Sequence, residues 1–188
     1  MKQLPSLEHH FLIAMPSLNG SWFEKAVIYI LEDNDRGTTG FVVNLPQDFQ
    51  VKDLLSHFDF PPPEKVSFLE QPILQGGPVD VEQGFILHKP EGKWKSSIAL
   101  PDGLTMTFSD DFVEALSKNQ AAESFLICLG FSGWKPGQLA QEIQSNSWLT
   151  IPYNESLLFD TPFEKKWQVA LETLGISPEF LTLEAGHA

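Results

Sequence analysis

Short apolar runs separated by polar, glycine-containing or proline-containing turns dominate the hydrophobic pattern of the chain. Because these runs are rich in β-branched and aromatic residues and too short for helices, they predict strands. They cover residues 11–14, 26–31, 40–44, 72–75, 84–88, 96–100, 105–108 and 124–131. The last run is the most apolar, which predicts a strand at the centre of the sheet.

Several of these strands are expected to pair with a neighbour along the chain. The pairs are 26–31 with 40–44, 72–75 with 84–88, and 96–100 with 105–108. Polar residues 32–37 predict a long hairpin loop in the first pair. Gly76-Gly77-Pro78 interrupts the second pair, and Pro101-Asp102-Gly103 turns the third.

Apolar residues at helical spacing predict four helices between the strands. The clearest pattern, i, i+3, i+4 and i+7, belongs to Val51, Leu54, Leu55 and Phe58 and ends before a run of three prolines. Two shorter helices are predicted from Phe112 with Leu116, after an N-cap at Ser109, and from Leu139 with Ile143.

The last helix carries the most complete set of end signals. Thr161 is placed to be its N-cap, Pro162 its first residue and Glu164 the third residue of a capping box, with Gly175 just past its end. Residues from 177 onward are expected to form a short turn and a loose tail. Hairpin-like strands with irregularly interspersed helices predict an α+β fold, and 188 residues fit one domain spanning 1–188.

Charge narrows the range of partners. The chain has 12 Lys and Arg against 25 Asp and Glu, a net charge of −13. Nucleic-acid binding depends on Lys and Arg that neutralise phosphates, and no dense cluster of cations is present, so direct nucleic-acid contact is disfavoured. Attraction to an anionic membrane is disfavoured for the same reason. No apolar run is long enough to span a bilayer and no signal peptide is recognisable, which predicts a soluble cytoplasmic protein.

The sequence contains no strong catalytic or cofactor signature. The dinucleotide, phosphate-loop, zinc-protease and nucleophile-elbow motifs are all missing, and one cysteine cannot build a thiolate zinc site. That cysteine, Cys128, lies in the most apolar run and is expected to be a core residue rather than a reactive thiol. We therefore expect no metal and no cofactor, and an enzyme is the less favoured reading.

Polar and glycine-rich strand ends are the best candidates for a binding site. One set of residues is predicted to line a single groove: Asn44, Gly76, Gly77, His88, Trp134, Gln138 and Glu142. Gln138 and Glu142 share a helix face at i, i+4. Each member has a structural alternative, because tryptophans usually pack in cores, glycine pairs usually form turns and a lone histidine is usually a hydrogen-bonded structural residue.

An internal echo links two members of this set. The segments Gly40-Phe41-Val42-Val43-Asn44 and Gly84-Phe85-Ile86-Leu87-His88 share one pattern, so an internal strand-pair pseudo-repeat would place Asn44 and His88 at equivalent strand ends. The alternative is coincidence between two ordinary strands.

Motifs in order along nearly the whole chain resemble the YqgE/AlgH family of bacterial proteins. They begin with Phe11-Leu12-Ile13-Ala14-Met15-Pro16, include the two echoed segments, and continue through Gly76-Gly77-Pro78-Val79, Gly133-Trp134, Gly137-Gln138-Leu139, Glu142-Ile143, Trp148, Leu158-Phe159 and Trp167. The resemblance implies an α+β fold with a barrel-like, largely antiparallel sheet and peripheral helices. It also implies a cytoplasmic protein without an established molecular activity, although some members are labelled transcriptional regulators.

Two departures from the family pattern concern charge. Leu45 stands where the family usually has Lys or Arg, and Ala140 where it often has Glu. If those charges belong to an anion or partner site, that site is altered in this chain.

Function is then expected to be binding or regulation through an unknown protein or small-molecule partner, without direct nucleic-acid or membrane contact. The alternative is a small-molecule enzyme in which His88 works with Glu142 or Asn44 in acid–base chemistry.

Overall fold

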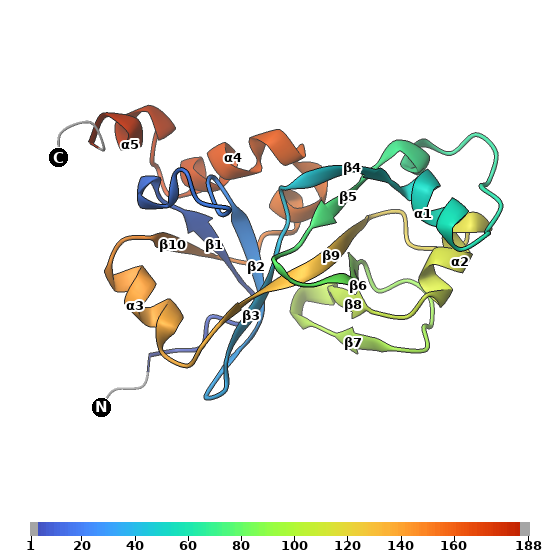
Figure 1. The fold of residues 1–188 in the computed structure, drawn as a ribbon, viewed down its shortest axis with the longest axis horizontal. Coiled ribbons are helices and arrows are strands. Elements are labelled where there is room, and N and C mark those ends of the chain that lie inside the picture. The colour runs from blue at the N-terminus through green and yellow to red at the C-terminus, as the bar shows by residue number, and fades with distance from the viewer. Residues whose placement is uncertain (1–3, 185–188) are drawn as a thin grey trace.

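The computed structural model describes residues 4–184 (Figure 1). One long strand, β9 (Phe125–Trp134), is the centre of its β-sheet. Along one edge β9 pairs antiparallel with β3 (Gly37–Val42) and parallel with β5 (Pro72–Gln75). Along the other edge it pairs antiparallel with β6 (Val79–His88). β9 is therefore the strand to which both halves of the sheet attach, as its apolar sequence predicts.

The sheet continues outward from β9 in the order β10-β1-β2-β3-β9-β6-β8-β7, and β4 joins it by pairing with β5. All these pairs except β5 with β9 are antiparallel. The remaining strands are β1 (His10–Ala14), β2 (Val27–Asn34), β4 (Pro46–Gln50), β7 (Ser97–Ala99), β8 (Thr105–Thr107) and β10 (Trp148–Pro152).

Helices lie around the periphery of the sheet (Figure 1). In that view α1 and α2 lie together at one end of the molecule, α3 lies at the other end, and α4 and α5 lie along the upper side. The α-helices are α1 (Val51–His57), α2 (Asp111–Ser117), α3 (Gln138–Gln144), α4 (Lys166–Thr173) and α5 (Pro178–Glu184). Short 3-10 turns cover Pro16–Leu18, Ser67–Glu70, Pro101–Gly103 and Phe163–Lys165, and a π-helical turn covers Ser156–Asp160.

Apolar side chains are buried on both faces of the sheet. On β1, Phe11 and Ile13 join the core that the sheet curls around, whereas Leu12 and Ala14 join a second core under α3. A third core lies under α1 and α2 and includes Ile127 of β9. Burial on both faces explains why the strands read as continuous apolar runs rather than alternating ones. The predicted α+β class and the curled, largely antiparallel sheet are confirmed.

The predicted pairing of segments 72–75 and 84–88 is wrong. β5 pairs with β4 and, in parallel, with β9, so β5 and β6 flank β9 on opposite edges. The chain crosses from one edge to the other at Gly76 and Gly77. β4 escaped prediction because Pro46–Gln50 is polar and shows no apolar alternation.

Local signals were also misread at two turns. The first hairpin is tight, because β2 extends to Asn34 and β3 starts at Gly37, so the polar residues between the apolar runs lie mostly in the strands. The last long helix starts at Lys166, after a 3-10 turn, and not at Pro162. The Thr161 hydroxyl donates to the Ser156 carbonyl of the preceding turn and caps no helix. Residues after 177 form α5 rather than a turn, and 185–188 lie outside the described residues.

Candidate functional site

Three of the predicted groove residues lie together at α3. The Glu142 carboxylate accepts hydrogen bonds from the indole N–H of Trp134 (2.8 Å) and of Trp148 (2.9 Å), both through Oε2. Gln138 Nε2 donates to the other oxygen, Oε1, at 3.1 Å. Both oxygens are thus occupied by neighbouring side chains.

The local sequence explains this cluster. Trp134 ends β9 and Trp148 begins β10, and their rings meet edge to face with centroids 6.0 Å apart. Gln138 and Glu142 are one helical turn apart on α3, so both reach the same point. Because the carboxylate is satisfied by two buried indoles, its role is to hold α3 on the sheet rather than to face a ligand.

His88 lies in a different part of the molecule and is fully buried. Its Nδ1 lies 2.6 Å from the Lys89 carbonyl oxygen and its Nε2 lies 2.7 Å from the Thr107 hydroxyl. A carbonyl can only accept, so Nδ1 carries the proton and Thr107 donates to Nε2. Burial lowers the pKa of His88, which favours this neutral ring.

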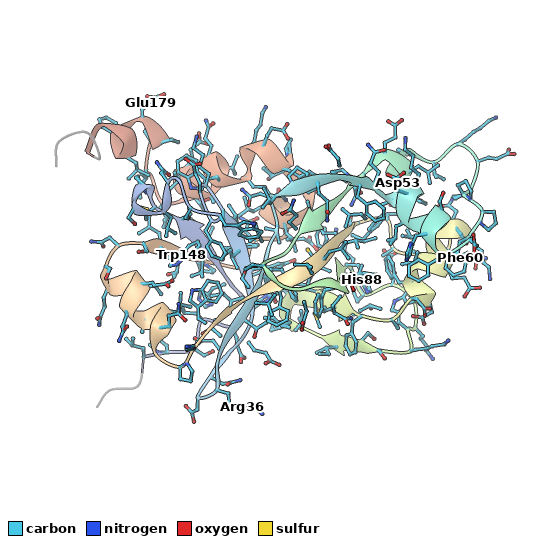
Figure 2. The ribbon with its side chains drawn as sticks, in the orientation of Figure 1. Arg36, Asp53, Phe60, His88, Trp148 and Glu179 are labelled. Atoms are coloured by element: carbon cyan, nitrogen blue, oxygen red, sulfur yellow. The ribbon has the colours of Figure 1, made fainter. Side chains whose placement is uncertain are left out.

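The structure does not bring His88 near its proposed acid–base partners. His88 pairs with Phe125 at the first residue of β9, whereas Trp134, with its Glu142 bond, is the last residue of that strand. A ten-residue strand spans roughly 30 Å. In Figure 2 the labels of His88 and Trp148 lie on opposite sides of β9. The prediction that His88 and Glu142 form a catalytic pair is therefore contradicted by their positions near opposite ends of β9.

Asn44 also has a local task. Its amide nitrogen donates to the Lys25 carbonyl and its amide oxygen accepts from the Val27 N–H, both at 2.8 Å. These bonds hold Lys25 at a φ of 54°, with its ammonium 5.5 Å from the Trp167 ring. Asn44 lines a cleft of about 490 Å³ that is also lined by Trp22 and Trp167. Within residues 4–184, Asn44 makes no hydrogen bond to His88.

Gly76 and Gly77 are glycines because β9 lies against them. A Cβ on Gly77 would lie 2.0 Å from the backbone of Phe131, and one on Gly76 would lie 2.4 Å from the Gly130 carbonyl oxygen. The Gly76 carbonyl accepts from the Val42 N–H and the Ser132 hydroxyl. The two glycines let the chain cross β9 closely, which favours a structural role over a binding role for this pair. The seven predicted residues thus do not share one face.

The two echoed segments do meet. β3 and β6 flank β9 on opposite edges, and the rings of Phe41 and Phe85 lie 4.9 Å apart between centroids. Their ends differ in role, since Asn44 binds backbone groups of another loop and His88 binds Thr107. The internal repeat remains a prediction.

An apolar groove that the sequence did not reveal lies between α1 and α2. We call it the α1–α2 groove, and its volume is about 610 Å³. It is lined by Phe49, Leu54, His57, Phe58, Val81, Glu82, Gln83, Gly84, Ile86, Phe108, Ser109, Asp110, Val113, Ile127 and Leu129. Its floor is formed by β6 and β9 and its walls by the two helices and the residues between β8 and α2.

Three large apolar side chains of this groove are open to solvent. Phe58 is 38% exposed, Val81 57% and Phe108 43%. The lining includes the carboxylates of Glu82 and Asp110 and no Lys or Arg. Gly84 leaves the floor bare, because a Cβ there would meet nothing closer than a Leu129 methyl group at 3.9 Å. Helical spacing predicted Phe58 to be buried, and no local signal marked it as exposed.

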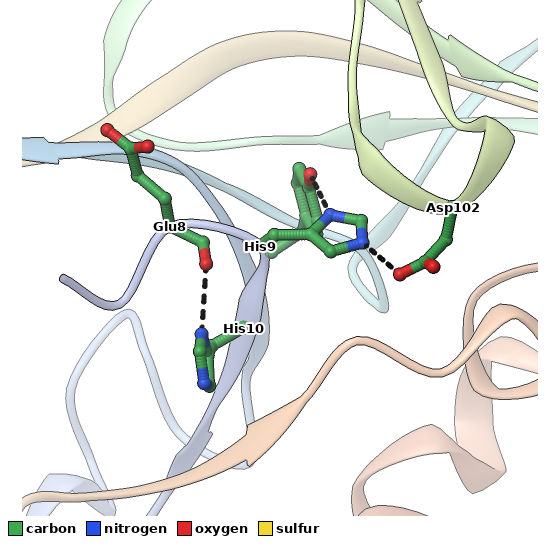
Figure 3. Close-up of polar contacts among 5 residues, drawn as sticks. Glu8, His9, His10 and Asp102 are labelled. Carbon is green, nitrogen blue, oxygen red and sulfur yellow. Dashed lines mark hydrogen bonds and ion pairs between the residues drawn. The ribbon is translucent and has the colours of Figure 1, made fainter. Parts of the chain in front are cut away.

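A polar contact joins the two ends of the curled sheet (Figure 3). His9, just before β1, places Nε2 2.9 Å from Asp102 in the turn between β7 and β8, and Nδ1 2.8 Å from the Tyr29 hydroxyl. The His9 ring also stacks on Tyr153 at 4.2 Å. Since a carboxylate can only accept, Nε2 carries the proton in the neutral ring and Tyr29 donates to Nδ1.

The titratable side chains of Cys128 and Lys166 are also buried, and both have structural roles. Cys128 is fully buried in the core, and desolvation raises its pKa to about 12, which suits the predicted core residue and not a nucleophile. Lys166 is also fully buried, and its ammonium donates to the Leu157 and Leu158 carbonyls of the π-helical turn. Desolvation lowers the pKa of Lys166 to about 8.

Within residues 4–184, no cluster of three or more His, Cys, Asp or Glu side chains is placed to hold a metal ion. Over the same range, no helix has the length and hydropathy to cross a bilayer.

Fold and surface together define a class: an α+β protein with a curled, largely antiparallel sheet and an exposed apolar groove. The AlgH-like family model matches residues 11–179, and the chain belongs to that family. A UPF0301 protein of Hydrogenovibrio crunogenus is 58% identical over 187 residues and covers 100% of both chains. A UPF0301 protein of Vibrio cholerae is 42% identical, covering 97% of this chain and 100% of its own.

Solved structures agree with this assignment. The solution structure of the AlgH protein from Pseudomonas aeruginosa is 38% identical, with a TM-score of 0.77 over 100% of both chains. The crystal structure of a protein from Corynebacterium diphtheriae, 21% identical, has the same fold with a TM-score of 0.70 over 97% of this chain and 93% of its own. The YqgE/AlgH resemblance read from the motifs is confirmed.

Proposed function

We propose that this protein is a cytoplasmic regulatory protein that acts by binding another protein in the α1–α2 groove. The observation that carries the proposal is the exposure of Phe58, Val81 and Phe108 around one apolar cavity. Exposed apolar groups that converge on a concavity are typical of binding sites, because their burial by a partner releases water from apolar surface.

The other predicted site residues support binding over catalysis. His88 is buried and neutral, and both of its ring nitrogens have hydrogen-bond partners. Glu142 accepts three hydrogen bonds from indole and amide groups, two of them from buried tryptophans that hold it against the sheet. These structural contacts favour binding over acid–base chemistry for these groups. The net charge of −13 argues that any influence on transcription is indirect.

Site-specific photo-crosslinking in living cells tests the proposal. A photoreactive phenylalanine analogue replaces Phe108 in the groove or, as a control, Phe180, which is 67% exposed on α5. We expect a discrete protein adduct from position 108 that position 180 does not give. Gly84→Phe, which fills the groove floor, should remove that adduct. An adduct that persists in the Gly84→Phe background, or none at position 108, would refute binding in this groove.

A further inference from the structure

We propose that the α1–α2 groove receives an amphipathic α-helix whose apolar face is flanked by basic side chains. This inference rests on the proposed function and specifies the chemistry of the partner. It follows from three properties of the groove: the hydrogen bonding of its floor, the shape of its apolar surface and the sign of its charges.

The floor favours a helix over an extended peptide. β9 pairs with β6 along one edge and with β5 along the other, and β8 covers the outer edge of β6 from Ile86 to His88, so these parts of the floor strands have their edges occupied. Residues 80–83 leave this ladder between Val79 and Gly84, but Asp80 has a φ of 46°, which breaks an extended course. An incoming strand would find no regular ladder, whereas a helix satisfies its own backbone groups.

The apolar surface has the form that such a helix needs. Walls from α1 and α2 carry Leu54 and Val113, and Ile86 and Ile127 lie on the floor between them. Phe58 and Phe108 stand partly exposed beside this floor. Gly84 leaves a space in the floor that a side chain from a partner can enter. Helix-in-groove recognition uses this arrangement, in which side chains at i, i+3, i+4 and i+7 enter an apolar channel.

Charge selects the flanks of the helix. Glu82 of β6 and Asp110 before α2 carry the only formal charges among the lining side chains, apart from any on His57. The whole chain adds to this field with a net charge of −13. Lys or Arg beside the apolar face of a partner would be attracted, and Asp or Glu would be repelled, with a strength that falls as salt rises.

Synthetic peptides test each element of the inference on the full-length protein. The probe is a fluorescent 18-residue peptide of Leu and Lys patterned as an amphipathic helix. One control replaces each Lys by Glu, and another scrambles the Leu and Lys order. Fluorescence anisotropy at low and high salt gives the dissociation constants. We expect micromolar binding of the patterned Leu–Lys peptide, at least tenfold weaker binding of both controls, and weakening by salt.

Three variants locate the binding. Gly84→Phe, which keeps all charges, should weaken the Leu–Lys peptide at least tenfold while leaving the urea midpoint of unfolding within error. Glu82→Gln and Asp110→Asn should each weaken it a few-fold and flatten its salt dependence. Equal binding to Gly84→Phe and the parent protein would mean attraction to acidic surface elsewhere, and would overturn the inference.

The remaining outcomes separate this inference from the proposed function. Equal affinity for the Leu–Lys and Leu–Glu peptides, both lost in Gly84→Phe, would overturn the charge selection and leave partner binding in the groove intact. Equal affinity for the scrambled peptide would overturn the helix. Self-association that Gly84→Phe abolishes, seen by sedimentation, would replace the partner by a second copy and overturn the inference. Failure of the crosslinking experiment would instead refute the proposed function.

Discussion

His9 and Asp102 are 93 residues apart in sequence, yet their side chains meet at 2.9 Å and join the two ends of the curled sheet. His9 precedes β1 and Asp102 lies between β7 and β8, near opposite ends of the strand order. Both residues have a positive φ, 59° and 56°, which non-glycine residues rarely adopt. Lys89 and Glu155 bridge the same opening at 3.5 Å. Side-chain contacts between His9 and Asp102 and between Lys89 and Glu155 thus close the open side of the curled sheet.

The two hydrogen bonds of His9 should contribute unequally to stability. Asp102→Asn should cost about 0.5 kcal/mol or less, because the Asp102 side chain is 71% exposed, an asparagine oxygen can still accept from His9, and exposed polar contacts contribute little. Tyr29→Phe should cost about 1–3 kcal/mol, because Tyr29 is buried and its loss leaves His9 Nδ1 without its donor. Urea unfolding of both variants measures the difference. A larger loss for Asp102→Asn would contradict this account of the closure.

Glu142 should be essential for the attachment of α3. Glu142→Ala removes the oxygen that accepts both indole N–H groups, so both buried donors lose their acceptor. We expect a loss of about 2–4 kcal/mol in the free energy of unfolding and a change in tryptophan fluorescence. The matched control is Gln138→Ala, which removes one exposed donor and should cost under about 1 kcal/mol. Similar losses for the two variants would mean that the indole bonds contribute little.

Buried His88 should make the fold sensitive to mild acid. Its pKa in the folded protein is lowered by desolvation, so the unfolded chain binds a proton at a higher pH than the folded chain does. The contribution of His88 to stability is therefore complete above the ordinary pKa of histidine, about 6.5, and is lost as pH falls below it. His88→Gln should lose less stability than the parent protein between pH 7 and pH 5. Parallel pH profiles from urea unfolding would contradict a neutral buried ring.

Lys166 should make the stability of the fold depend on pH in the alkaline range. Its pKa is lowered to about 8 in the folded protein, chiefly by desolvation, so between pH 8 and the ordinary value of 10.5 the unfolded chain binds more protons. The cost of burying the ammonium is present in full below pH 8 and disappears as pH rises. The parent protein should therefore gain about 2 kcal/mol relative to Lys166→Met between pH 7.5 and 9.5.

Urea unfolding at these two pH values measures the difference, and the upper value stays below the ordinary pKa of tyrosine. Burial raises the pKa of Tyr29 and of Cys128, so both lose protons more readily in the unfolded chain, but the parent protein and Lys166→Met carry both residues and this effect cancels in the comparison. A constant difference between the two proteins across this range would mean that Lys166 titrates in the same way in both states.

Sequence alone determined the positions of most strands and helices. Continuous apolar runs such as 124–131 must be buried on both faces, and a sheet with cores on each side is the arrangement that buries them. Helical spacing placed α1 and α3 for the same reason. The ordered motifs determined the family. Pairing was less well determined, because the crossing at Gly76 and Gly77 depends on how closely β9 approaches them.

The tertiary structure decided which side chains meet and which remain exposed. His88 and Glu142 both belong to recognisable motifs, but they lie near opposite ends of β9 because strand register, not sequence proximity, sets their distance. The α1–α2 groove arises because Phe58, Val81 and Phe108 come from three separate segments: the end of α1, β6 and the residues after β8. Their exposure depends on packing between those segments, and no local pattern of polar and apolar residues encodes it.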